Sequence, residues 1–172
     1  MTLNPFILLA LSLTLMFVSC NRATPSGFWE DYNTRFLVSD ISDQGPQGGH
    51  RAVYWRSDKT FSFDTKDILD FATKNGWTLT DSSTFNQEQT ITWMYDNKEI
   101  FPLSGTGFND SIKNISTYKY FPRWFGGPLR LYKFKTGWVT IEPGTGNPME
   151  ENGFVLLNQD KTELTVYHLW GE

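Results

Sequence analysis

The fold is decided by the C-terminal stretch Glu163-Leu164-Thr165-Val166-Tyr167-His168-Leu169-Trp170. In an extended chain, Leu164, Val166 and Trp170 fall on one side, and Tyr167 and Leu169 fall on the other. A strand that is apolar on both sides is typical of the interior of a sheet, where both faces are covered. The stretch therefore predicts a central strand.

The segments before this strand predict a meander of two hairpins. Residues 153–157 are predicted to pair with residues 163–170 across a polar turn. Residues 129–135 are predicted to pair with residues 138–141 across Thr136-Gly137, because glycine suits a tight turn. The C-terminal third of the chain is therefore expected to form an antiparallel sheet.

The rest of the chain predicts further strands and one main helix. Asp64 or Thr65 can cap a helix over residues 65–75, and Gly76 can end it in the left-handed conformation. A Gly/Pro-rich loop is predicted over residues 43–50. Further strands are predicted over residues 36–41, 51–56, 77–80, 90–95 and 99–101, and a short helix over residues 109–116. The expected fold class is α+β: a mainly antiparallel sheet with one main helix near residues 65–75 packed on it.

The N-terminus carries an apolar run that ends at the only cysteine of the chain. Residues 5–19 are uncharged, and the run is shorter than the roughly 20 apolar residues that a membrane-spanning helix needs. Phe17-Val18-Ser19-Cys20 resembles the processing site of bacterial lipoproteins. The resemblance implies that the Cys20 thiol receives a diacylglyceryl group and that Cys20 becomes the mature N-terminus. A plain secretory signal with a leftover cysteine is the alternative.

This resemblance also implies an organisation and a location. Residues 1–19 are expected to be a lipoprotein signal peptide, residues 20–27 a lipidated tether, and residues 28–172 a single globular domain. Asn21 resembles the residue that follows the cysteine in lipoproteins of the outer membrane. The expected location is therefore the bacterial cell envelope, with a lipid anchor in the outer membrane.

Positive charge gathers in one stretch of a chain whose formal net charge is −4. No acidic residue lies between Asp110 and Glu142. The basic residues there, interleaved with aromatic ones, are Lys113, Lys119, Arg123, Arg130, Lys133 and Lys135. Guanidinium groups and rings together suit an anionic ligand. A half-buried strand with its cations facing water or acidic side chains gives the same pattern.

The loop over residues 120–128 contains the candidate binding site. Arg123, Trp124, Phe125 and, on the adjoining strand, Lys133 are the residues proposed to contact a ligand. The alternative is that this loop folds back and that its rings plug the end of the sheet.

The sequence predicts no catalytic residue, metal site or cofactor. His50 and His168 are the only histidines, and His168, within an apolar strand, is expected to be a hydrogen-bonded structural residue. Carboxylate pairs such as Glu30-Asp31 and Glu150-Glu151 leave an acid/base pair open. Nucleic acid is not expected as a partner, because the net charge is negative.

The function predicted from the sequence is therefore binding rather than catalysis. The chain is expected to be a membrane-anchored envelope lipoprotein that binds an envelope protein or an anionic glycan. An inhibitor or immunity-type protein and an envelope hydrolase that uses carboxylates are the alternatives.

Overall fold

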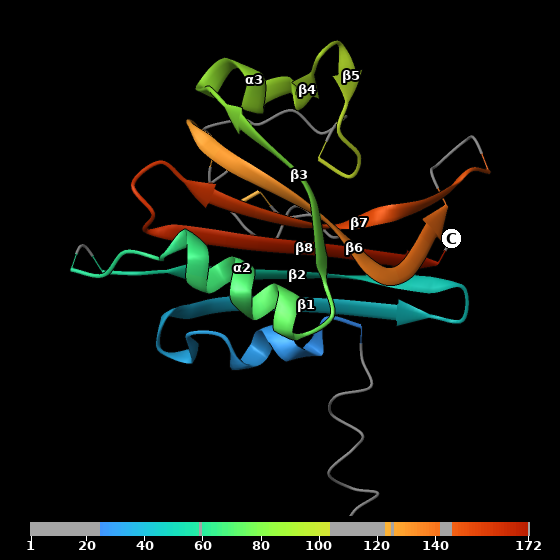
Figure 1. Cartoon of the computed structure of the whole chain (residues 1–172), viewed down its shortest axis with the longest axis horizontal. Helices are drawn as coiled ribbons and strands as arrows, with labels where there is room; N and C mark the ends of the chain where they lie inside the picture. Colours follow the sequence, from blue (N-terminus) through green and yellow to red (C-terminus); the bar gives the residue numbers. More distant parts are fainter. Residues whose placement is uncertain (1–24, 59, 104–122, 125, 142–145, 172) are drawn as a thin grey trace, which may run out of the picture.

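The computed structural model describes residues 25–58, 60–103, 123–124, 126–141 and 146–171 (Figure 1). The elements, in chain order, are the 3-10 helices η2 (Gly27–Asp31) and η3 (Thr34–Phe36), strands β1 (Leu37–Gly45) and β2 (Gly48–Arg56), helix α2 (Thr65–Lys74), strand β3 (Thr78–Phe85), helix α3 (Gln87–Thr92), and strands β4 (Met94–Tyr95), β5 (Lys98–Glu99), β6 (Leu129–Ile141), β7 (Pro148–Asn158) and β8 (Glu163–Gly171).

Six strands form one sheet in the order β1-β2-β8-β7-β6-β3, and neighbouring strands are antiparallel. The prediction of a mainly antiparallel sheet with one main helix is confirmed. β8 lies between β2 and β7, as the apolar pattern on both of its sides predicts. The predicted hairpin of β7 and β8 is also confirmed, with Gly153 opposite His168 and Leu157 opposite Leu164.

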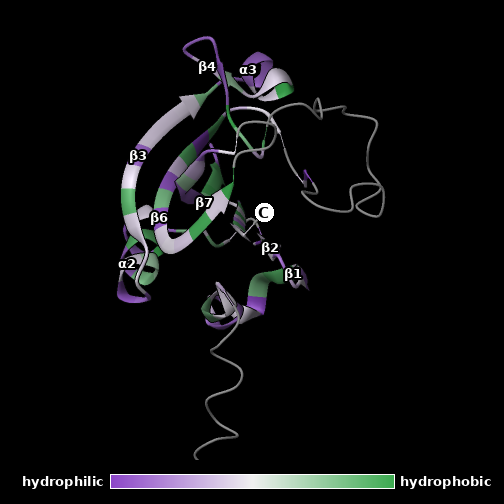
Figure 2. Ribbon diagram, turned by 90° about the vertical axis from the view of Figure 1, so that its right-hand side faces the viewer, coloured by the Kyte–Doolittle hydropathy of each residue, from purple (hydrophilic) through white to green (hydrophobic). Residues whose placement is uncertain are grey.

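The sheet is strongly curved where β6 bends. β6 pairs with β7 along most of its length, yet Thr140 near its end pairs in parallel with Gly171 of β8. Figure 2 shows β3 and β6 as arcs that wrap around one side of the molecule. Strand curvature of this kind needs a local break in the regular pairing. The break lies between Lys135 and Thr140, where the register of β6 against β7 shifts.

Buried side chains cover both faces of the sheet, and alternation along each strand divides them between two clusters. In β2, Val53 and Trp55 belong to one cluster, and Ala52 and Tyr54 belong to the other. We call the first cluster the front core; its other members are Trp29, Tyr32, Phe63, Ile68, Ala72, Trp77, Tyr132, Phe134, Val155, Leu157, Leu164 and Val166. We call the second cluster the back core; its other members are Phe85, Trp93, Ile100, Leu103, Leu129, Leu131, Phe154, Leu156 and Tyr167.

Helix α2 forms where its capping signals predict. The Asp64 side chain accepts hydrogen bonds from the backbone amides of Lys66 and Asp67, which satisfies two of the free donors at the helix start. Gly76, just past the end, has a φ of 91°. Ile68 and Ala72 are fully buried and belong to the front core, and Figure 1 shows the helix in front of the sheet.

The prediction of a hairpin across Thr136-Gly137 is wrong. Residues 129–141 form the single strand β6, which pairs with β7 and β3 rather than folding back on itself. Gly137 does have a positive φ of 80°, as a turn would require. The glycine serves a bulge instead, because a bulge uses the same backbone conformation to bend a strand without reversing it.

Two other segments differ from their predictions. A third predicted segment lies outside the described residues. The first residues of the strand predicted over 90–95 belong to helix α3, because Asn86 and Gln89 form a reciprocal capping box that satisfies amides at the helix start. The predicted loop over residues 43–50 is mostly strand, since β1 runs to Gly45 and β2 begins at Gly48. The helix predicted over residues 109–116 lies outside the described residues.

Candidate functional site

Trp124, the central residue of the predicted site, lies on the back core and is partly buried. Its ring stacks nearly parallel to Tyr54, with 5.2 Å between ring centroids and 6° between planes. It lies in the same way beside Tyr167, at 6.3 Å and 8°. The Arg123 guanidinium is placed over the Trp93 ring, 5.3 Å from its centroid, in a cation–π contact. Phe125 and Cys20 lie outside the described residues.

Lys133 lies on the same face of the sheet as Trp124. In the sheet register, Lys133 is opposite Phe154 of β7, and Phe154 is opposite Tyr167 of β8. These three residues therefore form a row across the sheet, and Trp124 stacks at its end. The Lys133 ammonium lies 3.9 Å from the Asp81 carboxylate, so its charge is already partly balanced within the chain. The fold thus brings Trp124 and Lys133 onto one face without bringing them into contact.

A pocket of about 380 Å³ opens at the other face, beside the start of α2. Its lining residues come from α2, β3, β6, β7 and the turn before β8: Thr65, Thr84, Pro128, Leu129, Arg130, Tyr132, Leu157, Asn158, Gln159 and Lys161. Two of these residues, Arg130 and Lys161, are cationic, and no acidic residue is among the described lining residues. We call this site the anion pocket.

The Arg130 side chain is held in place at the edge of this pocket. Its guanidinium lies 5.4 Å from the Tyr132 ring centroid, and its Nη2 donates to the Ser82 hydroxyl at 3.3 Å. Neither contact supplies a negative charge, so the guanidinium keeps its capacity for a carboxylate or phosphate. The sequence placed Arg130 in the basic stretch but gave no signal for Lys161, which reaches the pocket only through the β7–β8 pairing.

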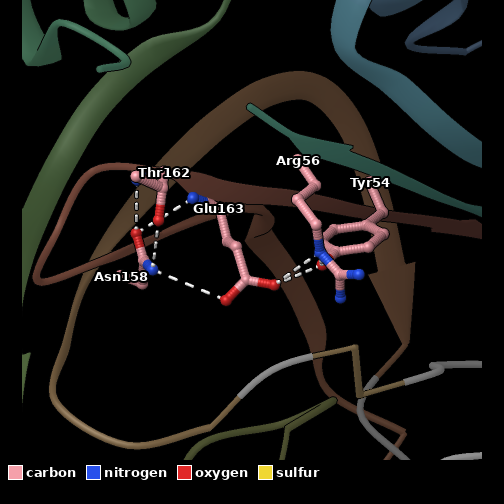
Figure 3. A network of polar contacts seen from close by, with 5 residues as sticks. All are labelled: Tyr54, Arg56, Asn158, Thr162 and Glu163. Atoms are coloured by element: carbon pink, nitrogen blue, oxygen red, sulfur yellow. Dashed lines mark hydrogen bonds and ion pairs between the residues drawn. The ribbon is translucent and has the colours of Figure 1, made fainter. Parts of the chain in front are cut away.

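The turn that carries Lys161 is fixed by a polar network (Figure 3). The Asn158 side-chain oxygen accepts from the backbone amides of Thr162 and Glu163 at 2.8 and 3.0 Å, and its amide donates to the Thr162 hydroxyl at 3.1 Å. Lys161 has a φ of 57°, which the tight turn requires. The network therefore orders the rim of the anion pocket before any ligand arrives.

The same network reaches the opposite face of the sheet through Glu163. Its carboxylate accepts from the Tyr54 hydroxyl and from Arg56 Nε. Burial raises the pKa of Tyr54, and the hydrogen bond to Glu163 raises it further, so this phenol stays protonated and donating. Because Trp124 stacks on the Tyr54 ring, one set of contacts links the pocket rim to the predicted Arg123–Trp124 site.

A second polar network is buried at the opposite end of the sheet. His168 is fully buried and takes the structural role predicted for it: Nδ1 lies 2.6 Å from the Ser26 hydroxyl and Nε2 lies 2.9 Å from the Thr136 hydroxyl. Thr136 donates its proton to the Asn152 side-chain oxygen, so it accepts from Nε2–H, and Nδ1 accepts from Ser26. Ser26 belongs to the predicted tether of residues 20–27, yet residues 25–27 are buried in the folded part.

One carboxylate of each pair that the sequence left open for acid/base chemistry has another partner. Glu30 accepts from the buried Arg51, and Glu150 pairs with Lys135 at 2.7 Å. The hydrogen bond from Lys135 lowers the pKa of Glu150. Within the described residues, no group of three or more His, Cys, Asp or Glu side chains is placed to hold a metal ion. No helix in the described part of the chain has the length and apolar character needed to cross a bilayer.

Comparison with known proteins finds no relative for this chain. No protein family, curated protein or solved structure matches it. Its function is therefore inferred from the residues themselves.

Proposed function

We propose that the chain is a lipid-anchored protein of the bacterial envelope and that its folded part binds an anionic glycan in the anion pocket. The observation that carries this proposal is that Arg130 and Lys161 line the same pocket and that no acidic residue is among its described lining. In a chain with more acidic than basic residues, a pocket whose charged residues, among the described lining, are all cations is a local exception. Such a site favours a negatively charged ligand.

The dimensions and chemistry of the pocket suit a small ligand or the terminal sugar of a glycan. A volume of about 380 Å³ lies within the usual range of small-molecule sites. Leu129, Tyr132 and Leu157 are buried and give it an apolar floor. The hydroxyls of Thr65 and Thr84 add groups that can donate to or accept from sugar hydroxyls. A uronic acid, with a carboxylate on a compact ring, matches this combination.

Replacing Arg130 by alanine is expected to weaken the binding of trigalacturonic acid about tenfold or more. The variant loses the bidentate partner of a sugar carboxylate, and a charge-assisted hydrogen bond contributes roughly 1.5–3 kcal/mol. The measurement is calorimetric titration of the full-length chain in a zwitterionic detergent at low salt. Higher salt should weaken the binding by the wild-type chain, because exposed charges are screened.

Arg35→Ala is the matched control for that experiment. Arg35 is also an exposed arginine, but it pairs with Asp58 away from the pocket. Its loss should leave the affinity unchanged. Equal affinities of wild type and Arg130→Ala, or no binding of trigalacturonic acid by the wild type, would contradict the anion pocket.

The lipid anchor predicts that Cys20→Ser abolishes acylation. Only the thiol can carry the diacylglyceryl group, and the serine hydroxyl does not replace it. Mass spectrometry of the native protein should find two or three acyl chains at residue 20 and no Met1, and the variant should carry no acyl chain. Thr14→Ala, a change within the apolar run, is the control and should remain acylated. An unmodified Cys20 or a retained Met1 in the native protein would overturn the anchor.

The proposal includes the organisation expected from the sequence. Residues 1–19 are the signal peptide, and residues 28–172 are one globular domain with α2 packed on the sheet. The shared burial of Ile68 and Ala72 with strand residues in the front core supports this packing. Because residues 25–27 are buried in the folded part, the proposed tether is shorter than residues 20–27.

A further inference from the structure

Trp138 differs from the other tryptophans of the chain in its exposure. Its exposed fraction is 48%, whereas the other six tryptophans are buried or partly buried. Tryptophan side chains are highly buried on average in folded proteins, so the exposure of Trp138 calls for a structural cause. The exposure follows from the bulge in β6.

The bulge lifts Trp138 out of the sheet. Lys135 is paired with Glu151 and Thr140 with Met149, so only Glu150 of β7 lies opposite the four intervening residues of β6. Extra residues in one strand redirect side chains, and such bulges are frequent beside functional sites.

Partly buried hydrogen bonds hold the backbone of the bulge. The Trp138 amide donates to the Thr136 hydroxyl at 3.3 Å, and the Trp138 carbonyl accepts from the Asn152 side chain at 3.0 Å. Thr136 and Asn152 are themselves buried and belong to the network of His168. The backbone that presents the indole is therefore fixed before a ligand binds, which lowers the entropy lost on binding.

A second pocket, of about 310 Å³, opens beside the exposed indole. Its lining residues are Gly76, Thr78, Lys135, Gly137, Trp138, Val139 and Glu150. A side chain added at Gly76 or Gly137 would meet no atom within 4 Å, so the backbone here borders open space. Lys135 and Glu150, both in the lining, form an ion pair with 2.7 Å between the charged groups. The described lining is therefore neutral overall but rich in donors and acceptors.

We infer that this second pocket binds a neutral saccharide, with a sugar ring stacked on Trp138. The negative face of an indole attracts the weakly positive C–H groups on a pyranose face. The Glu150 carboxylate accepts from sugar hydroxyls, and the Lys135 ammonium and the Thr78 hydroxyl donate to them. The balanced pair disfavours an anionic ligand or an anionic lipid surface, because Glu150 would repel either one.

The saccharide site is separate from the anion pocket. Gly76 follows the end of α2, whereas Thr65 of the anion pocket begins it, and a ten-residue helix is roughly 15 Å long. The inference does not rest on the proposed function, since the two sites share no lining residue. One glycan with neutral and acidic sugars would contact the two ends of α2.

The test is the binding of neutral oligosaccharides by the full-length chain in a zwitterionic detergent without sugar groups. Cellohexaose, chitohexaose and maltohexaose are titrated separately by calorimetry, with tryptophan fluorescence as a second readout. At least one of them should bind with a Kd below about 1 mM. Trp138→Ala should weaken that binding about tenfold or more, and Trp138→Phe, which keeps a ring, should retain most of it.

Two control variants establish whether the sugar binds at Trp138 rather than elsewhere on the surface. Tyr95 is also an exposed aromatic residue, with an exposed fraction of 44%, but it lies on β4 outside the pocket, so Tyr95→Ala should bind normally. Arg35→Ala, which removes an exposed cation that lines neither pocket, should also bind the neutral sugar normally. Melting of each variant is measured, and Trp138→Ala should melt close to wild type. The inference is overturned if none of the three sugars binds, or if Trp138→Ala binds as wild type does.

Discussion

Acidification from pH 7 toward pH 3 is expected to remove on the order of 5 kcal/mol of folding free energy through His168 alone. Burial lowers the pKa of His168 from 6.5 to about 3 in the folded protein. Between these two pH values His168 is protonated in the unfolded chain but neutral in the folded chain, so the free energy of unfolding falls as the pH falls. The stabilising effect is complete above pH 6.5 and is lost progressively down to the folded pKa.

Urea denaturation of wild type and His168→Gln, at intervals from pH 7 to pH 4, measures this effect. The variant should be less stable at pH 7, because it disturbs the hydrogen bonds to Ser26 and Thr136. Its stability should then change less with pH than that of wild type, and the difference between the two slopes isolates His168 from the carboxylates. His50→Gln is the control: burial also lowers the pKa of His50, but less extensively. Parallel pH profiles for wild type and His168→Gln would show that His168 titrates normally.

The His168 network joins the segment next to the proposed lipid anchor to the strand that carries the proposed saccharide site. Ser26 comes from the segment that leads to the proposed lipid anchor, Thr136 from the bulge of β6, and Asn152 from β7. A buried polar group destabilises a fold unless it is hydrogen-bonded, so these residues specify one arrangement of the segments. The network therefore fixes both Ser26, which follows the proposed tether, and the backbone of Trp138.

Local signals in the sequence predicted the elements that depend on local chemistry. Asp64 and Gly76 mark the ends of α2 through caps within one turn of the helix. The two-sided apolar pattern of residues 163–170 predicted the interior position of β8. Where two structures require the same local signal, the sequence was ambiguous: Gly137 suits a turn or a bulge, and only the pairing with β7 decides between them.

The candidate sites depend more on distant pairing, and the sequence predicted them less completely. Trp124 and Lys133 were grouped because they are close in sequence, but they share a face only because three strands align in register. Arg130 and Lys161 meet through the β7–β8 hairpin and the pairing of β6 with β7. The exposure of Trp138 depends on a register shift, which no pattern in one strand reveals. Sequence spacing therefore does not predict such sites.

Gly49→Ala is expected to destabilise the fold by about 3 kcal/mol or more. A Cβ at this position would lie 2.2 Å from the Asp43 carbonyl oxygen and 2.8 Å from the Trp170 ring. Gly49 is paired with Gln44 of β1 and with Trp170 of β8, so the alanine methyl group has to displace the backbone of one strand or the indole packed beside it. Thermal and urea unfolding measure the loss, which corresponds to a fall in Tm of roughly 6–12 °C.

Gly45→Ala is the matched control, because it lies in the same hairpin and a Cβ there meets only the Gly48 carbonyl oxygen, at 3.8 Å. Such a distance is an ordinary van der Waals contact, so the stability of this variant should stay within about 0.5 kcal/mol of wild type. The difference between the two glycines depends only on whether β1, β2 and Trp170 approach as closely as the sheet register requires. If both variants unfold at the same temperature, the end of the β1–β2 hairpin does not pack against the last strand, and the order β1-β2-β8 would need revision at this edge.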